Sequence, residues 1–293
     1  MTSSLNRRDF FRAGAGLAAG VAAMASGTAP LDAQGLTFGY LAFNDNEVIE
    51  GLTIERMAVG ILVRGKNITI KRCKFRHLLS HGSSGSGIVV RKECVNIRII
   101  DTEIDGRDSL SHGAGIALHP GSRGVQITDC YIHHMQHVGL SMGSTTYVDF
   151  LPDGLPVQSE HYVTRNVIEY CGTAGDSGDA GSGIVIVGQS HRHTLRENRV
   201  RRNTGHGIVL SGSRQGNGAL GTPAFDESPT WNTVAENIVE YNGGDGILNN
   251  GANYTWIRDN FCYANGAEPI RVISLGGLPD ARGVEMSSNR EVY

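Results

Sequence analysis

Residues 60–64 read Gly-Ile-Leu-Val-Arg, and residues 87–91 repeat the pattern as Gly-Ile-Val-Val-Arg. A glycine followed by a branched aliphatic residue and a short apolar run recurs along the chain. This Gly-Ile element begins at Gly60, Gly87, Gly115, Gly139, Gly183, Gly207 and Gly246. Self-similarity with a period of about 20–50 residues is typical of a solenoid, in which each repeat forms one structural unit.

A second recurring element lies between these stretches. It is a short strand of alternating apolar residues that ends in a small, mostly polar residue, at Cys73, Thr102, Cys130, Asn166, Asn198, Asn237, Asn260 and Asn289. Neither the skeleton of leucine-rich repeats nor the 3.6-residue period of helical repeats is present. We therefore predict an all-β, single-domain right-handed parallel β-helix solenoid of roughly eight coils, with the polar residues stacked at an inward bend about 4.8 Å apart.

The composition is consistent with a folded chain that is rich in turns. Of the 293 residues, 40 are glycine and 19% are charged, and the formal net charge is −3. This balance excludes the overall basic character that nucleic-acid binding needs. Five cysteines do not form a dense disulfide scaffold, and Cys73 and Cys130 are two coils apart, beyond the reach of a disulfide. We interpret both as structural thiols.

The N-terminal segment has the pattern of an export signal. Arg7 and Arg8 precede Phe10 and Arg12, and a weakly hydrophobic stretch follows at residues 13–25. This resembles a twin-arginine signal peptide. The resemblance implies a leader over residues 1–33, a β-helix domain over residues 34–293, and a periplasmic or extracellular location. An uncleaved N-terminal anchor is the alternative, although the apolar stretch is short for a bilayer, and no later segment is apolar enough to span one.

Over residues 38–293 the chain resembles the pectate-lyase-like, right-handed β-helix superfamily. Members are mostly polysaccharide lyases, glycoside hydrolases, uronate epimerases and proteins that hold glycans. The resemblance implies a polysaccharide partner, and the repeat pattern specifies the fold better than the chemistry. An enzyme and a noncatalytic glycan-binding or surface-structural module both remain open, as does the oligomeric state.

Counting outward positions along the Gly-Ile elements places Arg64, Arg91 and His119 in one column on three adjacent coils. Two guanidinium groups one strand spacing apart repel each other, so the column is easier to explain if it faces nearby carboxylates or an anionic partner such as a uronate-rich glycan. The alternative is an ordinary solvated face with splayed arginines. In the lyase or epimerase hypothesis an arginine neutralises the uronate carboxylate, and His119 or Tyr147 removes the neighbouring proton.

A second column precedes the glycines of the last Gly-Ile elements, at Ser182, His206 and Asp245. Stacking alone does not make a nucleophile triad, which also needs an oxyanion hole. Residues 205–207, Gly-His-Gly, resemble a motif of polygalacturonase-type hydrolases and make His206 a catalytic candidate. The paired carboxylates that such hydrolysis requires are missing on the two preceding coils, where Val138 and Ser182 stand.

Long insertions follow or precede some Gly-Ile strands, and insertions on one side of a solenoid usually build its binding face. Asp149 and Arg214, together with Asp245 of the second column, are therefore candidate substrate-binding residues. Asp176 and Asp179 in a Gly/Asp-rich loop could bind Ca²⁺ through oxygen ligands, although no known calcium loop is matched. Solvated turn acids are the alternative.

Overall fold

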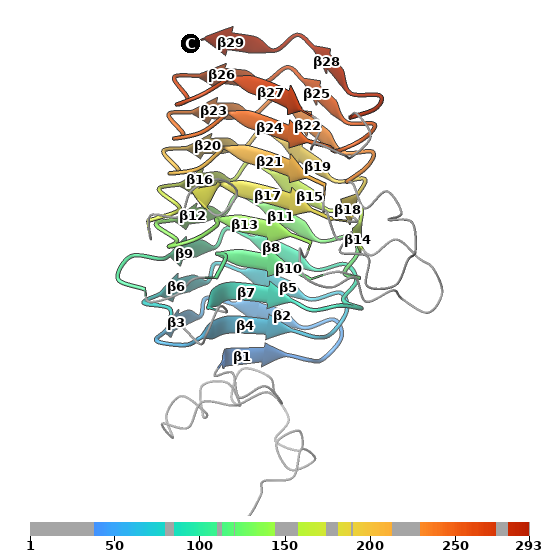
Figure 1. Ribbon diagram of the computed structural model, residues 1–293. Helices are drawn as coiled ribbons and strands as arrows, with labels where there is room; N and C mark the ends of the chain where they lie inside the picture. Colours follow the sequence, from blue (N-terminus) through green and yellow to red (C-terminus); the bar gives the residue numbers. More distant parts are fainter. Residues whose placement is uncertain are drawn as a thin grey trace, which may run out of the picture.

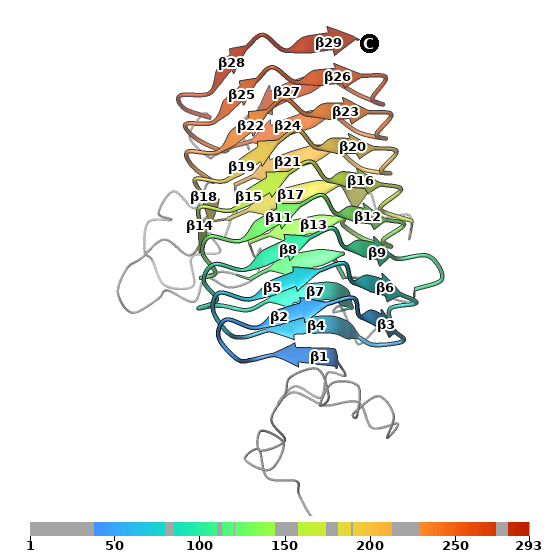
Figure 2. The same ribbon diagram turned by 180° about the vertical axis from the view of Figure 1, so that it is seen from behind.

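The computed structural model describes residues 38–79, 85–109, 113–119, 121–143, 158–173, 181–188, 190–212, 229–273 and 281–292. The predicted leader, residues 1–33, lies outside this set. The described chain winds as a right-handed parallel β-helix with three parallel sheets of nine strands each (Figures 1 and 2). No helix in these ranges is both long and apolar enough to cross a membrane.

Each coil contributes one strand to each sheet. The first sheet comprises β1 (Phe38–Ala42), β4 (Val59–Val63), β7 (Ser86–Val90), β10 (Ile116–Leu118), β13 (Leu140–Met142), β17 (Ile184–Val187), β21 (Ile208–Ser211), β24 (Ile247–Asn250) and β27 (Ile270–Ile273). The second comprises β2 (Val48–Glu50), β5 (Thr69–Lys71), β8 (Arg98–Ile100), β11 (Gln126–Thr128), β15 (Tyr162–Thr164), β19 (Thr194–Arg196), β22 (Thr233–Ala235), β25 (Trp256–Arg258) and β28 (Glu285–Ser287).

The third sheet comprises β3 (Thr53–Glu55), β6 (Lys74–Arg76), β9 (Glu103–Asp105), β12 (Tyr131–His133), β16 (Val167–Glu169), β20 (Arg199–Arg201), β23 (Ile238–Glu240), β26 (Phe261–Tyr263) and β29 (Arg290–Val292). A short fourth pair joins β14 (Gln158–Ser159) to β18 (Ser190–His191). The prediction of an all-β solenoid is confirmed, with about nine coils rather than eight. The count was one short because the first coil has Leu52, an apolar residue packed against the core, where later coils carry a ladder residue.

The Gly-Ile elements form the first sheet in register, with Ile61 opposite Ile88 and Ile88 opposite Ile116. These isoleucines are fully buried in the core that runs along the helix axis. The glycines are required because the coils approach closely at this point. A Cβ on Gly60 would lie 2.4 Å from the carbonyl oxygen of Gly87, closer than real Cβ atoms approach an oxygen. This contact explains why glycine recurs.

The predicted ladder stands between the second and third sheets. The side-chain oxygen of Asn198 accepts from the backbone N–H of Asn166 at 3.1 Å and from its Nδ2 at 3.0 Å. Asn198 in turn donates to Asn237 of the next coil at 3.0 Å. Cys130 continues the ladder through its N–H, and burial raises the pKa of its thiol to about 12. That protonated, buried state agrees with a structural thiol.

Two more ladders, which the sequence analysis did not identify, hold other corners. Cys171, Asn203, Asn242 and Asn265 stack after the third sheet, each backbone N–H donating to the next asparagine. His161, His193 and Asn232 stack before the second sheet in the same manner. Buried side chains thus satisfy the backbone at the bends, which fixes the register that positions surface residues.

Candidate functional site

The predicted column of Arg64, Arg91 and His119 lies where strands β4, β7 and β10 end. The three strands pair in register up to their last residues. The next residue of each coil continues the pairing, since Arg91 donates its N–H to Val63 at 3.1 Å and His119 donates to Val90 at 2.9 Å. The fold therefore brings the three residues together on consecutive coils, along a line about 10 Å long.

The environment of this column separates the roles of its members. Arg64 is exposed, whereas Arg91 and His119 are half-buried. Burial, reinforced by the positive charge of Arg91, lowers the pKa of His119 to about 4. The imidazole is therefore neutral at pH 7, and one of its ring nitrogens keeps a lone pair that can accept a proton. It lies beside the guanidinium of Arg91, which is always charged.

Within this column, the positively charged side chains are confined to the second and third coils. One coil before Arg64 the equivalent position is Phe43, because the N–H of Arg64 bonds to the carbonyl of Ala42. One coil after His119 it is Gly143, whose N–H bonds to Leu118. The column is a short site of two cations and a neutral base, bounded by uncharged positions on both sides.

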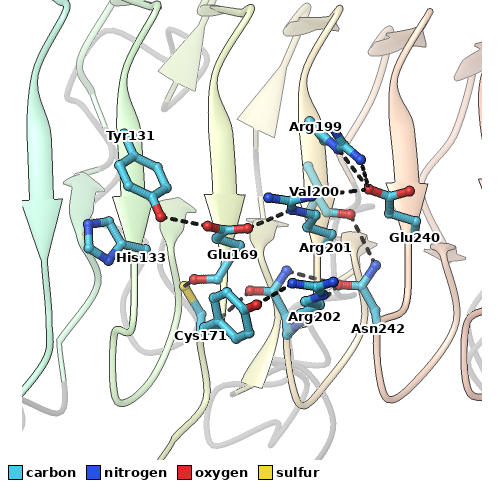
Figure 3. A network of polar contacts seen from close by, with 12 residues as sticks. Tyr131, His133, Glu169, Cys171, Arg199, Val200, Arg201, Arg202, Glu240 and Asn242 are labelled. Atoms are coloured by element: carbon cyan, nitrogen blue, oxygen red, sulfur yellow. Dashed lines mark hydrogen bonds and ion pairs between the residues drawn. The ribbon is translucent and has the colours of Figure 1, made fainter.

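A second polar array runs along the outer face of the third sheet. Asp105, His133, Glu169, Arg201 and Glu240 lie opposite one another on successive strands. Figure 3 shows the central part of this row, where acidic and basic side chains alternate. All five are at least partly buried. Sequence analysis did not find this row, although each member lies three residues after a predicted ladder residue, and that fixed offset is the signal that identifies it.

Hydrogen bonds satisfy the centre of this row. The Tyr131 hydroxyl donates to Glu169 Oε1 at 2.6 Å, and Arg201 Nε donates to Glu169 Oε2 at 2.5 Å (Figure 3). Burial raises the pKa of Glu169, but these two hydrogen bonds outweigh it and lower the pKa below its usual value. Arg199 pairs with Glu240 at 2.5 Å. The ions neutralise one another, so this part of the row stabilises the sheet.

An aromatic edge lines the same face, at the turn that follows each third-sheet strand. His134 stacks on Tyr170 with ring centroids 4.9 Å apart. The guanidinium of Arg202 lies 5.5 Å from the Tyr170 ring and 6.0 Å from the Tyr241 ring. Arg202 and Tyr241 are exposed, so one side of this edge is open to a ligand.

The second predicted column forms a backbone cap. His206 donates its N–H to Ser182 Oγ at 3.1 Å, and His206 Nδ1 accepts the N–H of Asp245 at 2.8 Å. Asp245 is buried, and its carboxylate accepts the N–H of Glu268 at 3.0 Å. Since Nδ1 accepts the hydrogen bond from the Asp245 backbone N–H, it does not donate to the Asp245 carboxylate as a triad histidine would. These contacts give both side chains a structural part, and we place neither in the candidate site.

Five predicted residues lie outside the part of the chain that the structure describes. They are Tyr147, Asp149, Arg214, Asp176 and Asp179. The candidate base Tyr147 and the candidate calcium ligands therefore stay predictions. The described site consists of Arg64, Arg91 and His119.

The family model described as "right handed beta helix region" matches residues 40–222. The chain belongs to the right-handed β-helix family. A search of curated proteins finds no match.

Solved structures share this fold at low identity. The A-module of the mannuronan C-5 epimerase AlgE4 from Azotobacter vinelandii is 16% identical, with 96% of this chain and 76% of that chain covered and a TM-score of 0.61. The AlgE6 A-module from the same organism is also 16% identical, with 93% of this chain and 70% of that chain covered and a TM-score of 0.59. A double mutant of the periplasmic alginate epimerase AlgG is 15% identical, with 86% of this chain and 55% of that chain covered and a TM-score of 0.59. At these identities the likeness is one of fold.

Proposed function

We propose that this chain is an exported protein that binds a uronate-containing polysaccharide along the column of Arg64, Arg91 and His119. The observation that carries the proposal is the register of β4, β7 and β10, which puts two cations and a neutral histidine on three consecutive coils, with Arg91 next to His119. The twin-arginine-like leader supports export. The names of the AlgE4, AlgE6 and AlgG structures, which are mannuronan and alginate epimerases, support a uronate polymer as ligand.

The charge arrangement favours a polyanion. Arg64 and Arg91 stand one strand spacing apart, about 4.8 Å, so each raises the electrostatic energy of the other. A carboxylate placed between them relieves that repulsion and can accept paired N–H bonds from either guanidinium. A polymer with a carboxylate on each sugar would bind along the helix axis and engage both arginines.

The same geometry supports proton abstraction next to the carboxylate. An arginine that neutralises the uronate carboxylate makes the adjacent C5–H more acidic, because it stabilises the negative charge that develops on the carboxylate. Neutral His119 can accept that proton through its free ring nitrogen. Loss of the 4-linked oxygen then gives an unsaturated sugar, whereas return of a proton to the opposite face gives the epimer. Tyr147 is the other candidate for a proton-transfer group.

A panel of polymers tests this proposal. The protein is incubated in D₂O with polymannuronate, polygalacturonate and uncharged dextran. Lyase action produces ultraviolet absorbance, epimerisation introduces deuterium at C5, and hydrolysis produces reducing ends without either. We expect binding to the uronate polymers alone, and a His119→Gln variant that binds but gives no product. Equal binding to dextran would refute the uronate assignment.

A noncatalytic glycan-binding module is the second candidate. The aromatic edge of Tyr170, Arg202 and Tyr241 favours it, since flat rings and a guanidinium in a row offer a stacking surface. This candidate predicts saturable binding with no product from any polymer of the panel. It also predicts that Tyr241→Ala weakens binding, whereas His119→Gln has no effect.

A further inference from the structure

Asp105, His133 and His134 form a compact cluster on the third sheet. One possible ligand atom from each residue lies within 4.8 Å of the other two. His133 Nδ1 is 2.8 Å from His134 Nδ1 and 3.6 Å from Asp105 Oδ1. Two imidazole nitrogens and a carboxylate oxygen thus surround one point. The hydrogen bonds of Glu169 in Figure 3 lie one strand away, beside His133.

Ring stacking holds both histidines in position. Tyr131 lies on His133 with centroids 4.0 Å apart and planes 23° from parallel. Tyr170 lies on His134 at 4.9 Å and 19°. Asp105 and His133 are direct partners on paired strands β9 and β12, so the backbone fixes their separation. The cluster is therefore preorganised by the sheet and by its neighbours.

The far nitrogen of His133 faces a carboxylate. His133 is 1% exposed, and its Nε2 has no hydrogen-bond partner within the described residues. Glu103 Oε1 lies 3.7 Å from this Nε2. A histidine that binds a metal through one nitrogen commonly points its other N–H towards a carboxylate, which fixes the tautomer and strengthens the ligand. Glu103 stands in that place.

We propose that Asp105, His133 and His134 bind a divalent first-row transition metal ion such as Zn²⁺ through the two Nδ1 atoms and the carboxylate. Nitrogen and oxygen ligands suit this class of ion, whereas Ca²⁺ and Mg²⁺ prefer oxygen alone. Three protein ligands leave a fourth position for water or for an oxygen of a bound molecule. Tetrahedral Zn²⁺ holds two nitrogens about 3.3–3.4 Å apart, so the rings need to separate by about half an ångström.

One cation competes with a metal ion for this cluster. The cation is Arg107, whose side chain donates to both oxygens of Asp105 at 2.8–3.1 Å. That side chain is 59% exposed and can move into solvent when an ion arrives. Arg107 is thus a competitor for the metal.

Zinc titration of the full chain by calorimetry tests the site, with Co²⁺ absorption as a second readout. In His134→Asn, asparagine tolerates the backbone φ of 56°. His77→Asn is the matched control, since His77 occupies the same turn two coils earlier with a φ of 51°. We expect one Zn²⁺ per chain, a loss of affinity of at least about tenfold in His134→Asn, and unchanged binding in His77→Asn.

Two further variants sharpen the test. Arg107→Ala should tighten Zn²⁺ binding, because it removes the cation that competes for Asp105. Glu103→Gln should weaken it by about 10–100-fold, as expected for a carboxylate that orients a metal-bound histidine. Equal affinity in wild type and His134→Asn would overturn the proposal, as would the absence of saturable binding or weaker binding in Arg107→Ala. A rise in melting temperature with Zn²⁺ that His134→Asn abolishes would support it.

Discussion

The imidazole ring of His161 lies on that of His193 in the next coil, with centroids 4.7 Å apart and planes 7° from parallel. Nδ1 of His193 accepts the N–H of His161 at 3.2 Å, and Nδ1 of His161 accepts the N–H of Val125 at 3.1 Å. Both rings must therefore be neutral, because a protonated Nδ1 could accept neither bond. These two histidines fill a corner of the solenoid that asparagine fills elsewhere.

This pair makes folding sensitive to acid. Burial lowers the pKa of His161 to about 3, and burial together with His161 lowers the pKa of His193 well below 6.5. In the unfolded chain these histidines take up protons near pH 6.5, whereas in the folded chain they stay neutral. The free energy of unfolding is therefore highest above pH 6.5 and falls as the pH drops towards 3. Within that pH range each histidine lowers the free energy of unfolding by about 1.4 kcal/mol for every unit that the pH falls.

We predict that His193→Asn makes stability less dependent on pH. Asn232 already holds the equivalent position in the next coil, so an asparagine fits the ladder. Urea unfolding at pH 7 and pH 5 measures the change. The wild type should lose more stability than the variant, by about 2 kcal/mol over that interval. Equal losses in the two proteins would show that His193 protonates in the folded state.

We predict that His119 titrates near pH 4 in the folded protein. Burial is the main cause and the charge of Arg91 is the second, so Arg91→Gln should raise the pKa of His119 without returning it to 6.5. Imidazole chemical shifts recorded by NMR from pH 3 to pH 8 measure both values. An unshifted pKa in Arg91→Gln would mean that the two side chains do not interact.

The ladder predicts a large cost for Asn198→Ala. Asn198 is 1% exposed, its oxygen accepts two bonds from Asn166, and its Nδ2 donates to Val163 at 2.8 Å. Alanine leaves several buried groups without partners, and each costs about 1–3 kcal/mol. Asn67→Gly is a control, because it removes an exposed amide at a φ of 55°. Chemical unfolding should show a loss above about 3 kcal/mol for Asn198→Ala and about 1 kcal/mol or less for the control.

The sequence predicted the parts of the fold that repeat. The Gly-Ile elements identify the first sheet because glycine is the residue that the contact between Gly60 and Gly87 allows. Ladder residues identify the turn between the other two sheets, and these two landmarks were enough to place Arg64 and Arg91 on adjacent coils. The first coil was missed because Leu52 has no polar side chain to reveal it.

The ladder also aligns part of the third sheet, which the sequence analysis did not use. Asp105 and His133 are partners on β9 and β12, and each lies three residues after a ladder residue, Thr102 or Cys130, so the ladder spacing predicts their pairing. Buried His161 and His193 resemble surface histidines until the ladder is seen. The second asparagine ladder, at Asn203, Asn242 and Asn265, lies five residues after the first one on each coil, so its spacing repeats that of the first ladder.

Binding of polymannuronate by the double variant Arg64→Ala and Arg91→Ala tests the proposed site most directly. The control variant Arg98→Ala and Arg258→Ala removes the same charge from the second sheet, at exposed positions on β8 and β25. At low salt we predict that the column variant loses at least about tenfold in affinity, while the control changes by less than about twofold. Equal affinity of the two variants for the polymer would contradict the assignment of the site to this column.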